Sequence, residues 1–523
     1  MLGLDAASPH LLRRWAGEGR LPHIRSLMDR GLTGDIRGLD GFFVGSTWPS
    51  FYTGRSPAGH GLHYLVQIRP GTYDYYKPAD GTLVKADPFW LRMDAAGVRT
   101  LVIDVPLTRL DRLVHGRQVV EWGSHDPLYG FRTEPADLGK RIMTRWGPHP
   151  VGSRCDAPDR GPDEYRGFRD ALIRGIRART ELTLEFLQQA DWDFTIQVFS
   201  EAHCAGHQCW HLHDPSHPAY DATLAAAAGG DTLLQVYEAL DDSIGRLLAA
   251  VPDATVFLIA GHGMGAWYGA QFLLQEILFR LGAAARPDPA PRRSPTLRSA
   301  AISAARTVWE RIPAGLRTWL APVRQRLGPR PHTSWSLGVE PSQSRCFVVG
   351  NGFPVGGIRL NLAGREPAGV LQPGADADHF SETLIEQLLA IVDDRTGHAA
   401  IQQVRRTRDL YQGPCLDALP DLLIEWSDEI ATGSTAVHQG AGARVTLRSA
   451  AIGRLTGANS YARTGDHRRD GLYVVAGSGI PAGRDGAPVG LMDFAPTFEC
   501  LAGLTPATGD GAPIPALCGP APS

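Results

Sequence analysis

The sequence lacks the features of disulfide-stapled and membrane-spanning proteins. Its 523 residues include only seven cysteines, an odd number without a Cys-x-x-Cys pair, so we expect no disulfide framework and a reducing compartment. No run approaches the roughly 18 apolar residues of a membrane-spanning helix, and no basic segment followed by an apolar one opens the chain. These absences predict a cytoplasmic protein with no transmembrane segment.

Charge of either sign is not in excess. The chain has 52 Lys and Arg against 55 Asp and Glu, a net charge of -3 and a pI near 6.7. Such a balance gives no overall attraction to nucleic acid or to anionic membranes, so we predict no nucleic-acid partner. Any preference for anions must be local, and composition leaves the oligomeric state open.

Short apolar runs rich in branched residues alternate with longer amphipathic stretches, a pattern typical of βαβ units. The sequence therefore predicts an α/β fold with a mostly parallel central sheet flanked by helices on both faces. The first expected strand is short for a central strand, which leaves open whether residues precede Met1. The expected strands are Met1–Asp5, Thr100–Val105, Phe194–Glu201, Thr255–Ala260, Asp421–Trp426 and Leu472–Ala476. The expected helices are Pro9–Ala16, Pro22–Arg30, Glu164–Gln189, Thr232–Ala250, Gln271–Leu281, Ser381–Val392 and Asp493–Leu501.

Residues 286–345 interrupt this alternation. The segment is rich in proline and arginine, and up to position 330 its ten arginines face only Asp288 and Glu310. Apolar residues such as Trp309 and Trp319 predict amphipathic helices, so we expect an inserted cap on a catalytic core formed by residues 1–285 and 346–523. The cap either attracts an anionic substrate or partner or only presents a solvated basic face.

Six side chains with metal-binding or nucleophilic chemistry follow the expected strands or begin the expected helices. In open α/β sheets, ligands bind where the carboxyl ends of the strands converge. Carboxylate oxygens and imidazole nitrogens are common ligands of divalent cations. The sequence therefore predicts one metal-dependent site, formed by Asp5, Thr47, His203, His207, His262 and His467.

Thr47 lies in the segment Gly45-Ser46-Thr47-Trp48-Pro49, where Pro49 suits the first turn of a helix. At a helix start, free backbone N–H groups and the helix dipole favour an anion, so an attacking Thr47 oxygen would meet a group whose charge is partly offset. The alternative is that Thr47 or Ser46 serves only as a helix N-cap.

Four histidines, at positions 203, 207, 211 and 213, fall within eleven residues directly after an expected strand. His203 and His207 are four residues apart, so both rings project from one face of a helix and can bind the same cation. Two further histidines, His262 and His467, occupy glycine-rich turns beside strands. A lone core histidine is ordinarily structural, but this density predicts metal binding.

Together these motifs resemble the alkaline phosphatase superfamily, specifically its type I phosphodiesterase and nucleotide pyrophosphatase branch. The resemblance implies an alkaline-phosphatase-like core and two metal ions, commonly zinc. It implies Thr47 as the nucleophile, Asp5 and His262 on one ion, and His207 and His467 on the other. The matches run in order through Gly3-Leu4-Asp5, Thr47-Trp48-Pro49-Ser50, His203 to Asp214, His262-Gly263-Met264, Gly465-Asp466-His467 and Met492-Asp493.

Two positions depart from the pattern of the branch. Gly261 stands where an aspartate usually precedes the His-Gly-Met motif, and His203 stands where an aspartate usually lies four residues before His207. The second change keeps a ligand, whereas the first removes one. If both carry over, His203, His207 and His467 form a neutral three-histidine zinc site with one open position. Whether one or two Zn²⁺ ions bind, or another divalent cation, stays open.

We therefore expect a metal-dependent phosphoric ester hydrolase, foremost a phosphodiesterase, that acts on a small anionic phosphate- or sulfate-ester through a covalent Thr47 intermediate. The alternatives are a sulfatase, phosphomonoesterase or phosphonate hydrolase of the same superfamily, or a catalytically degenerate binding or regulatory member. A formylglycine-type sulfatase is disfavoured because Ser46-Thr47-Trp48-Pro49 lacks the arginine of the Cys/Ser-x-Pro-x-Arg pattern. The substrate-binding residues remain unassigned.

Overall fold

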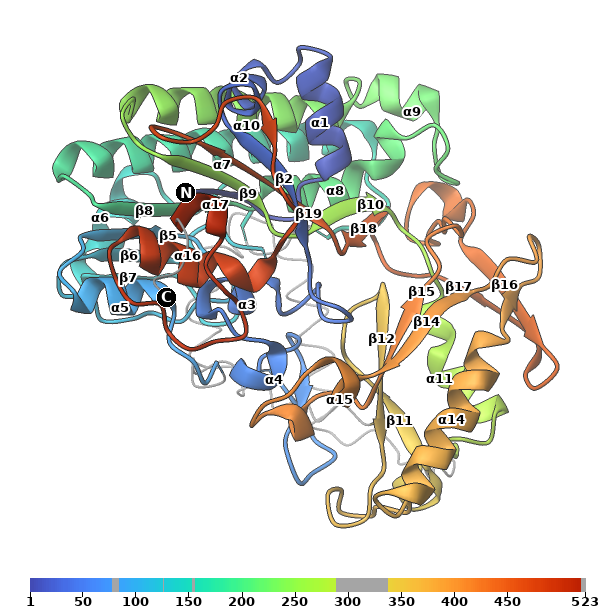
Figure 1. Ribbon diagram of the computed structural model, residues 1–523. Coiled ribbons are helices and arrows are strands. Elements are labelled where there is room, and N and C mark those ends of the chain that lie inside the picture. The colour runs from blue at the N-terminus through green and yellow to red at the C-terminus, as the bar shows by residue number, and fades with distance from the viewer. Residues whose placement is uncertain (78–83, 126, 153–155, 288–336, 519–523) are drawn as a thin grey trace, which may run out of the picture.

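A computed structural model describes residues 1–77, 84–125, 127–152, 156–287 and 337–518 (Figure 1). The chain forms a large lobe around a ten-stranded sheet and a smaller lobe around a four-stranded sheet. Most of the expected cap at 286–345 lies outside the described residues. Within the described part of the chain, no helix combines the length and apolar character needed to cross a membrane.

The ten-stranded sheet has the order β20-β2-β19-β9-β1-β8-β5-β6-β7, with β21 also beside β2. Its five neighbouring strands β9, β1, β8, β5 and β6 run parallel, which confirms the mostly parallel sheet. Strand β19 runs antiparallel to both β9 and β2, and β7 runs antiparallel to β6. The strands are β1 (Leu2–Leu4), β2 (Leu32–Arg37), β5 (Thr100–Ile103), β6 (Arg117–Val120), β7 (Arg132–Glu134), β8 (Phe194–Phe199), β9 (Val256–Ala260), β19 (Gly471–Ala476), β20 (Arg484–Asp485) and β21 (Val489–Gly490).

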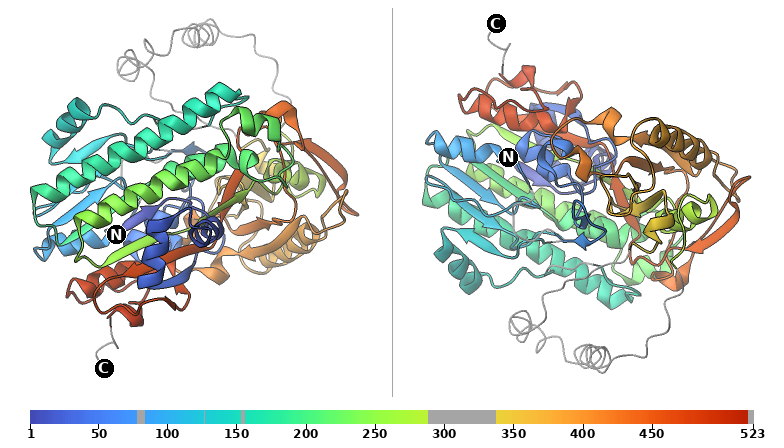
Figure 2. Two further views of the ribbon diagram at one scale, coloured as in Figure 1. Left: turned by 90° about the horizontal axis from the view of Figure 1, so that it is seen from above. Right: turned by 90° about the horizontal axis from the view of Figure 1, so that it is seen from below.

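Helices cover both faces of this sheet (Figure 1). Strand β19 shows why, because Leu472 and Val474 point into one hydrophobic core and Tyr473 and Val475 into the other. Helices α7 and α10 lie side by side over one face (Figure 2), and α10 has the bounds that the sequence predicts. That face carries α1 (Pro9–Gly17), α2 (Pro22–Arg30), α7 (Pro162–Gln189), α8 (Glu201–His213) and α10 (Thr232–Ala250); the other carries α3 (Thr47–Thr53), α5 (Phe89–Ala95) and α16 (Phe494–Leu501).

The smaller lobe has its own hydrophobic core. The strand expected at 421–426 is present as β15 (Leu422–Trp426), but it belongs to this antiparallel sheet and not to the large one. An apolar run of this length shows that a strand is buried without showing which strand it pairs with. The lobe contains β11 (Cys346–Val349), β12 (Val355–Leu360), β14 (Ile401–Arg406), α11 (Leu274–Arg280) and α14 (Ala375–Leu389), with β13 (Val392–Asp393), β16 (Arg444–Ser449) and β17 (Gly453–Ala458) in a further sheet.

A short two-stranded ribbon is formed by the chain segments that adjoin β9 and β19 of the large sheet. Strand β10 (Gly263–Ala266) follows β9, and β18 (Gly465–Arg468) precedes β19, and the two pair antiparallel. Because β19 runs opposite to β9, its start lies at the edge of the sheet where the parallel strands have their carboxyl ends. His467 therefore reaches the same edge as the residues that follow β1, β8 and β9.

Candidate metal-binding active site

The carboxyl edge of the parallel strands brings four of the predicted histidines together. The ring centroids of His203 and His207, both on α8, lie 4.7 Å apart. The ring of His467 on β18 lies 4.8 Å from His203 and 4.9 Å from His207. His262, directly after β9, lies 4.8 Å from His467. All four side chains are buried.

Asp5, which follows β1, contacts this cluster from the side. Its Oδ2 lies 2.7 Å from Nδ1 of His203, and its Oδ1 accepts a 2.7 Å hydrogen bond from Nε1 of Trp48. Both oxygens of the carboxylate are thus engaged by side chains. Asp5 fixes the orientation of the His203 ring and links it to α3.

His207 is held by Gly465, the first residue of β18, and by Arg463 just before that strand. Its Nδ1 donates to the carbonyl oxygen of Gly465 at 2.7 Å, while its Nε2 lies 2.9 Å from Nε2 of His203 and 3.2 Å from Nη1 of Arg463. Arg463 also forms an ion pair with Asp156 at 2.7 Å. Burial, followed by the charge of Arg463, holds the pKa of His207 well below its usual range.

Three residues in or beside the ribbon have unsatisfied polar atoms. Both ring nitrogens of His262, Nδ1 of His467 and Oδ2 of Asp466 are buried and have no hydrogen-bond partner among the described residues. Burial lowers the pKa of both histidines, so their rings are neutral at pH 7. Burial also raises the pKa of Asp466 to about 7. Unsatisfied buried polar atoms are costly and require an explanation.

Thr47 begins α3, as the sequence predicts, but its hydroxyl faces the backbone. Oγ1 donates a 2.8 Å hydrogen bond to the carbonyl oxygen of Phe43, and the residue is 1 % exposed. The Ser46 hydroxyl donates to the carbonyl oxygen of Leu62, so neither hydroxyl caps the helix. The side chain of Thr47 packs against Gly261, where an added Cβ would lie 3.0 Å from Thr47 Cγ2.

Sequence reasoning overlooked His125, Asp466 and Arg463 as members of the site. His125 follows β6, and its ring centroid lies 4.1 Å from that of His203. The pair Val119 and Val120 before it is a short apolar signal for β6, a strand that was not predicted. A histidine soon after a buried strand is the same arrangement that pointed to His262.

A cavity of about 290 Å³ opens beside these side chains. Its polar lining includes Asp5, His125, His203, His262, Arg463 and His467. Aromatic and apolar side chains form the remainder, with Tyr461 and Phe353 in contact at a centroid distance of 4.0 Å. The apolar and aromatic lining residues include Val44, Trp48, Tyr64, Leu65, Pro106, Leu107, Phe353 and Tyr461.

Comparison with known protein families identifies the family of this chain. Residues 1–314, more than half of the chain, match the type I phosphodiesterase / nucleotide pyrophosphatase family. The chain belongs to this family. Its membership confirms the expected placement in the alkaline phosphatase superfamily and makes the chain a phosphoester hydrolase by family. No curated protein matches the sequence.

Solved structures of similar fold come from both bacteria and mammals. Phosphonoacetate hydrolase from Sinorhizobium meliloti 1021, in complex with phosphonoformate, has a TM-score of 0.49 and 13% identity, covering 94% of this chain and 93% of that chain. Murine ectonucleotide pyrophosphatase / phosphodiesterase 5, in complex with AMP, has a TM-score of 0.47 and 10% identity, covering 98% of this chain and 97% of that chain.

Members of the type I phosphodiesterase family depend on divalent metals, and the donor atoms of this chain fit such an ion. Two groups of buried ligand atoms each lie within 4.8 Å of one another: His125, His203 and His207, and His207, Asp466 and His467. Neutral imidazoles with an occasional carboxylate are the ligands that zinc prefers. A bound cation would also satisfy the buried atoms of Asp466 and His467 that have no other partner among the described residues.

Proposed function

We propose that this chain is a metal-dependent phosphodiesterase in which Thr47 attacks the phosphorus atom of a small diester. The observation that carries the proposal is the convergence of His203, His207 and His467 beside a cavity at the carboxyl edge of the sheet, in a chain of this family. Zinc would be held in this cluster through His203 and His207, and when bound it would stabilise the negative charge that develops on the phosphoryl oxygens.

Thr47 supplies the attacking oxygen after a rotation about χ1. Threonine in a helix populates two rotamers because its hydroxyl can bond a carbonyl one turn back, and the bond to Phe43 represents one of them. Breaking that bond costs about 1 kcal/mol, which is small beside an activation barrier. Trp48 holds the adjacent backbone in place through its hydrogen bond to Asp5.

The charges of the cavity favour a diester over a monoester. Arg463 is the cationic side chain among the described lining residues, and Asp156 neutralises part of its charge. A diester carries one negative charge near pH 7 and a monoester carries close to two, so the diester needs less compensation. The wall formed by Tyr461, Phe353 and Tyr64 suits an apolar or aromatic ester group. Sulfate esters, which also carry one charge, are the second substrate class that this arrangement favours.

The test compares aryl substrates on the zinc-loaded protein. We expect bis(4-nitrophenyl) phosphate to be hydrolysed with a kcat/KM at least about tenfold above that of 4-nitrophenyl phosphate or 4-nitrophenyl sulfate. Thr47→Ala should lower kcat for the diester by roughly a thousandfold or more. Ser46→Ala is the matched control, because it removes a neighbouring buried hydroxyl that, among the described residues, hydrogen-bonds only to the carbonyl oxygen of Leu62.

Three results separate the possibilities. Full activity in Thr47→Ala contradicts the assignment of the nucleophile, whereas a preference for the monoester or the sulfate changes the substrate class. A folded, metal-loaded wild-type protein that hydrolyses none of these esters would favour a binding or regulatory member of the family.

A further inference from the structure

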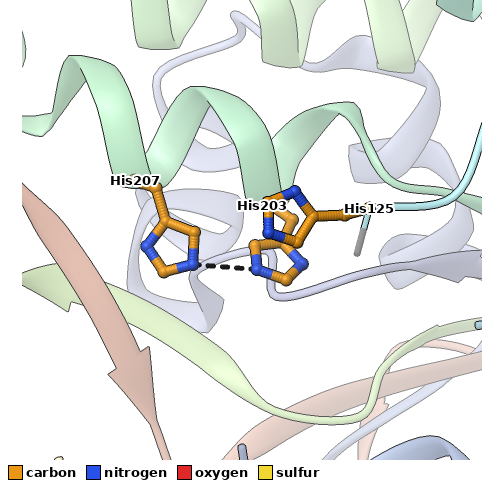
Figure 3. Close-up of side chains that lie close together, drawn as sticks. All are labelled: His125, His203 and His207. Carbon is orange, nitrogen blue, oxygen red and sulfur yellow. Dashed lines mark hydrogen bonds between the residues drawn. The ribbon is translucent and has the colours of Figure 1, made fainter. Parts of the chain in front are cut away.

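The site contains one more imidazole, beyond the four histidines that the sequence predicts. His125, from the segment between β6 and β7, lies beside His203, with its ring centroid 4.1 Å from that of His203 and 5.8 Å from that of His207 (Figure 3). The donor atoms of His125, His203 and His207 all lie within 4.8 Å of one another, and all three residues are buried. Figure 3 shows that His203 and His207 hang from the same face of α8, while His125 approaches from a different segment.

Hydrogen bonds fix which nitrogen of each ring on α8 can bind a cation. Nδ1 of His207 faces the carbonyl oxygen of Gly465, an acceptor, so this nitrogen carries the hydrogen. Nδ1 of His203 faces the carboxylate of Asp5 and therefore carries its hydrogen too. Both Nε2 atoms are left with a lone pair when the rings are neutral.

The two Nε2 atoms lie 2.9 Å apart, and Nη1 of Arg463 lies 3.2 Å from that of His207. At that distance either one ring carries a hydrogen on Nε2 and donates it to the other, or a cation lies between the two nitrogens. A zinc ion with bonds of about 2.0–2.1 Å in tetrahedral geometry places neighbouring ligand nitrogens about 3.3 Å apart, close to the observed separation. A ring nitrogen of His125 lies within 4.8 Å of a ring nitrogen of each of the other two histidines. A bound ion would also displace Nη1 of Arg463 from His207, while Arg463 would keep its ion pair with Asp156.

Asp5 orients the ring of His203. A carboxylate that accepts the Nδ1 hydrogen of a metal-binding histidine fixes the ring and makes its other nitrogen more basic. The Asp5 carboxylate does this for His203, and its second oxygen is held by Trp48. The same carboxylate cannot keep both contacts and also bind a second ion with the same lone pairs.

We propose that His125, His203 and His207 bind one divalent cation, and that Asp5 acts on this ion through His203 instead of ligating a second one. The proposal deepens the proposed function and rests on it for the role of the ion in hydrolysis. Three imidazole ligands leave a fourth position for an oxygen of the substrate. Nε2 of His207 can serve only one ion, so the group formed by His207, Asp466 and His467 does not hold a separate one.

The test measures zinc affinity by competition with a chromophoric chelator, the number of ions by native mass spectrometry, and the visible absorption of the Co²⁺-substituted protein. We expect one tight ion in the wild type. His125→Ala and His125→Gln should bind it at least about tenfold more weakly and shift the Co²⁺ spectrum. Asp5→Asn should weaken the same ion by roughly 10- to 100-fold without lowering the number of sites.

His217→Ala is the matched control, because His217 is buried but belongs to neither candidate metal group. It should leave zinc affinity unchanged, and circular dichroism should show that every variant is folded. Unchanged affinity and an unchanged Co²⁺ spectrum in both folded His125 variants overturn the role of His125. A wild type with two ions, from which Asp5→Asn removes one and leaves the other unaffected, overturns the role of Asp5.

Diester hydrolysis, measured on the same samples, keeps the two proposals distinguishable. Tight zinc binding that depends on His125, in a wild type that hydrolyses no ester, supports this inference and refutes the proposed function. Diester hydrolysis together with a zinc affinity that is unchanged in the His125 variants supports the proposed function and refutes this inference. A wild type that binds no zinc or cobalt refutes the inference.

Discussion

The two halves of the site differ in how many donor atoms remain available to a cation. The histidine cluster, formed by His203, His207 and His467, packs its rings within 4.9 Å of one another. The nucleophile pocket consists of Asp5, Thr47, Gly261 and His262. There Asp5 is engaged by Trp48 and His203, Thr47 bonds to Phe43, and Gly261 offers no side chain.

This difference teaches that residue identity alone does not define a ligand set. Asp5, Thr47 and His262 are all present, yet two of the three use their polar atoms within the protein. The histidines keep their lone pairs because burial holds the pKa of His207 and His467 well below the usual range, and a neutral ring can bind a metal.

The largest expected effect compares one histidine from each half. His207→Ala should weaken zinc binding by roughly a hundredfold or more, because it removes a ring whose Nε2 already lies 2.9 Å from Nε2 of a second histidine. His262→Ala should change the affinity by less than about threefold, since its half lacks partners for an ion. Isothermal titration calorimetry on both variants gives the two values. Similar losses in the two variants would mean that the halves bind metal equally.

A carboxylate at position 261 should give the nucleophile pocket a further metal ligand and bring its zinc affinity closer to that of the histidine cluster. We expect the Gly261→Asp variant to bind a second zinc ion roughly tenfold more tightly than the wild type does. The backbone permits it, because Gly261 is not among the residues with positive φ. The obstacle is packing, as a Cβ there lies 3.0 Å from Thr47 Cγ2 and 3.2 Å from Leu491 Cδ1. The methyl group of Thr47 must yield, at a cost of about 1 to 3 kcal/mol in stability.

Gly261→Ala is the control for that experiment, since it adds the same Cβ without a carboxylate. Native mass spectrometry at increasing zinc concentration counts the ions in each variant. If the aspartate and alanine variants bind the same number of ions with the same affinity, then the missing carboxylate does not explain the weakness of the nucleophile pocket.

The smallest expected effect is a change in the free energy of unfolding of the metal-free protein, caused by Asp466 beside the histidine cluster. Burial raises the pKa of Asp466 to about 7, above the value of about 3.9 in an unfolded chain. The folded state therefore carries a penalty that is complete above pH 7, decreases as the pH falls from 7 to 4, and is absent below that range. Asp466→Asn should stabilise the metal-free protein by on the order of 2 kcal/mol at pH 8 and by almost nothing at pH 4.

Urea denaturation in the presence of a chelator measures this difference at both pH values. The same substitution should weaken zinc binding slightly, because it replaces an anionic oxygen near His207 and His467 with a neutral amide. A stabilisation of equal size at both pH values would show that the effect does not come from the charge of Asp466.

Much of the arrangement follows from local sequence. The bounds of α2 and α10 agree with the prediction because their apolar spacing and start signals are contained within the helices themselves. The positions of His203, His207 and His262 could be predicted because each follows a buried strand or begins the next element. Thr47 was correctly placed at the start of a helix for the same reason.

Other features depend on contacts between distant segments. His125 reaches His203 from a loop 78 positions earlier in the chain, and no periodic signal marks that approach. The engagement of Asp5 with His203 and the rotamer of Thr47 depend on side-chain geometry that spacing does not encode.

The sequence by itself determined the family, the alternation of strands and helices, and the residue types that gather at one edge of the sheet. These follow from short-range periodicity and from the rule that parallel strands end together. Only the tertiary structure decided which atoms of those residues remain available, that His125 joins them, and that residues 422–426 pair in a second sheet. Hydrogen-bond partners and strand partners are chosen in three dimensions, where residues far apart in the chain compete for the same atoms.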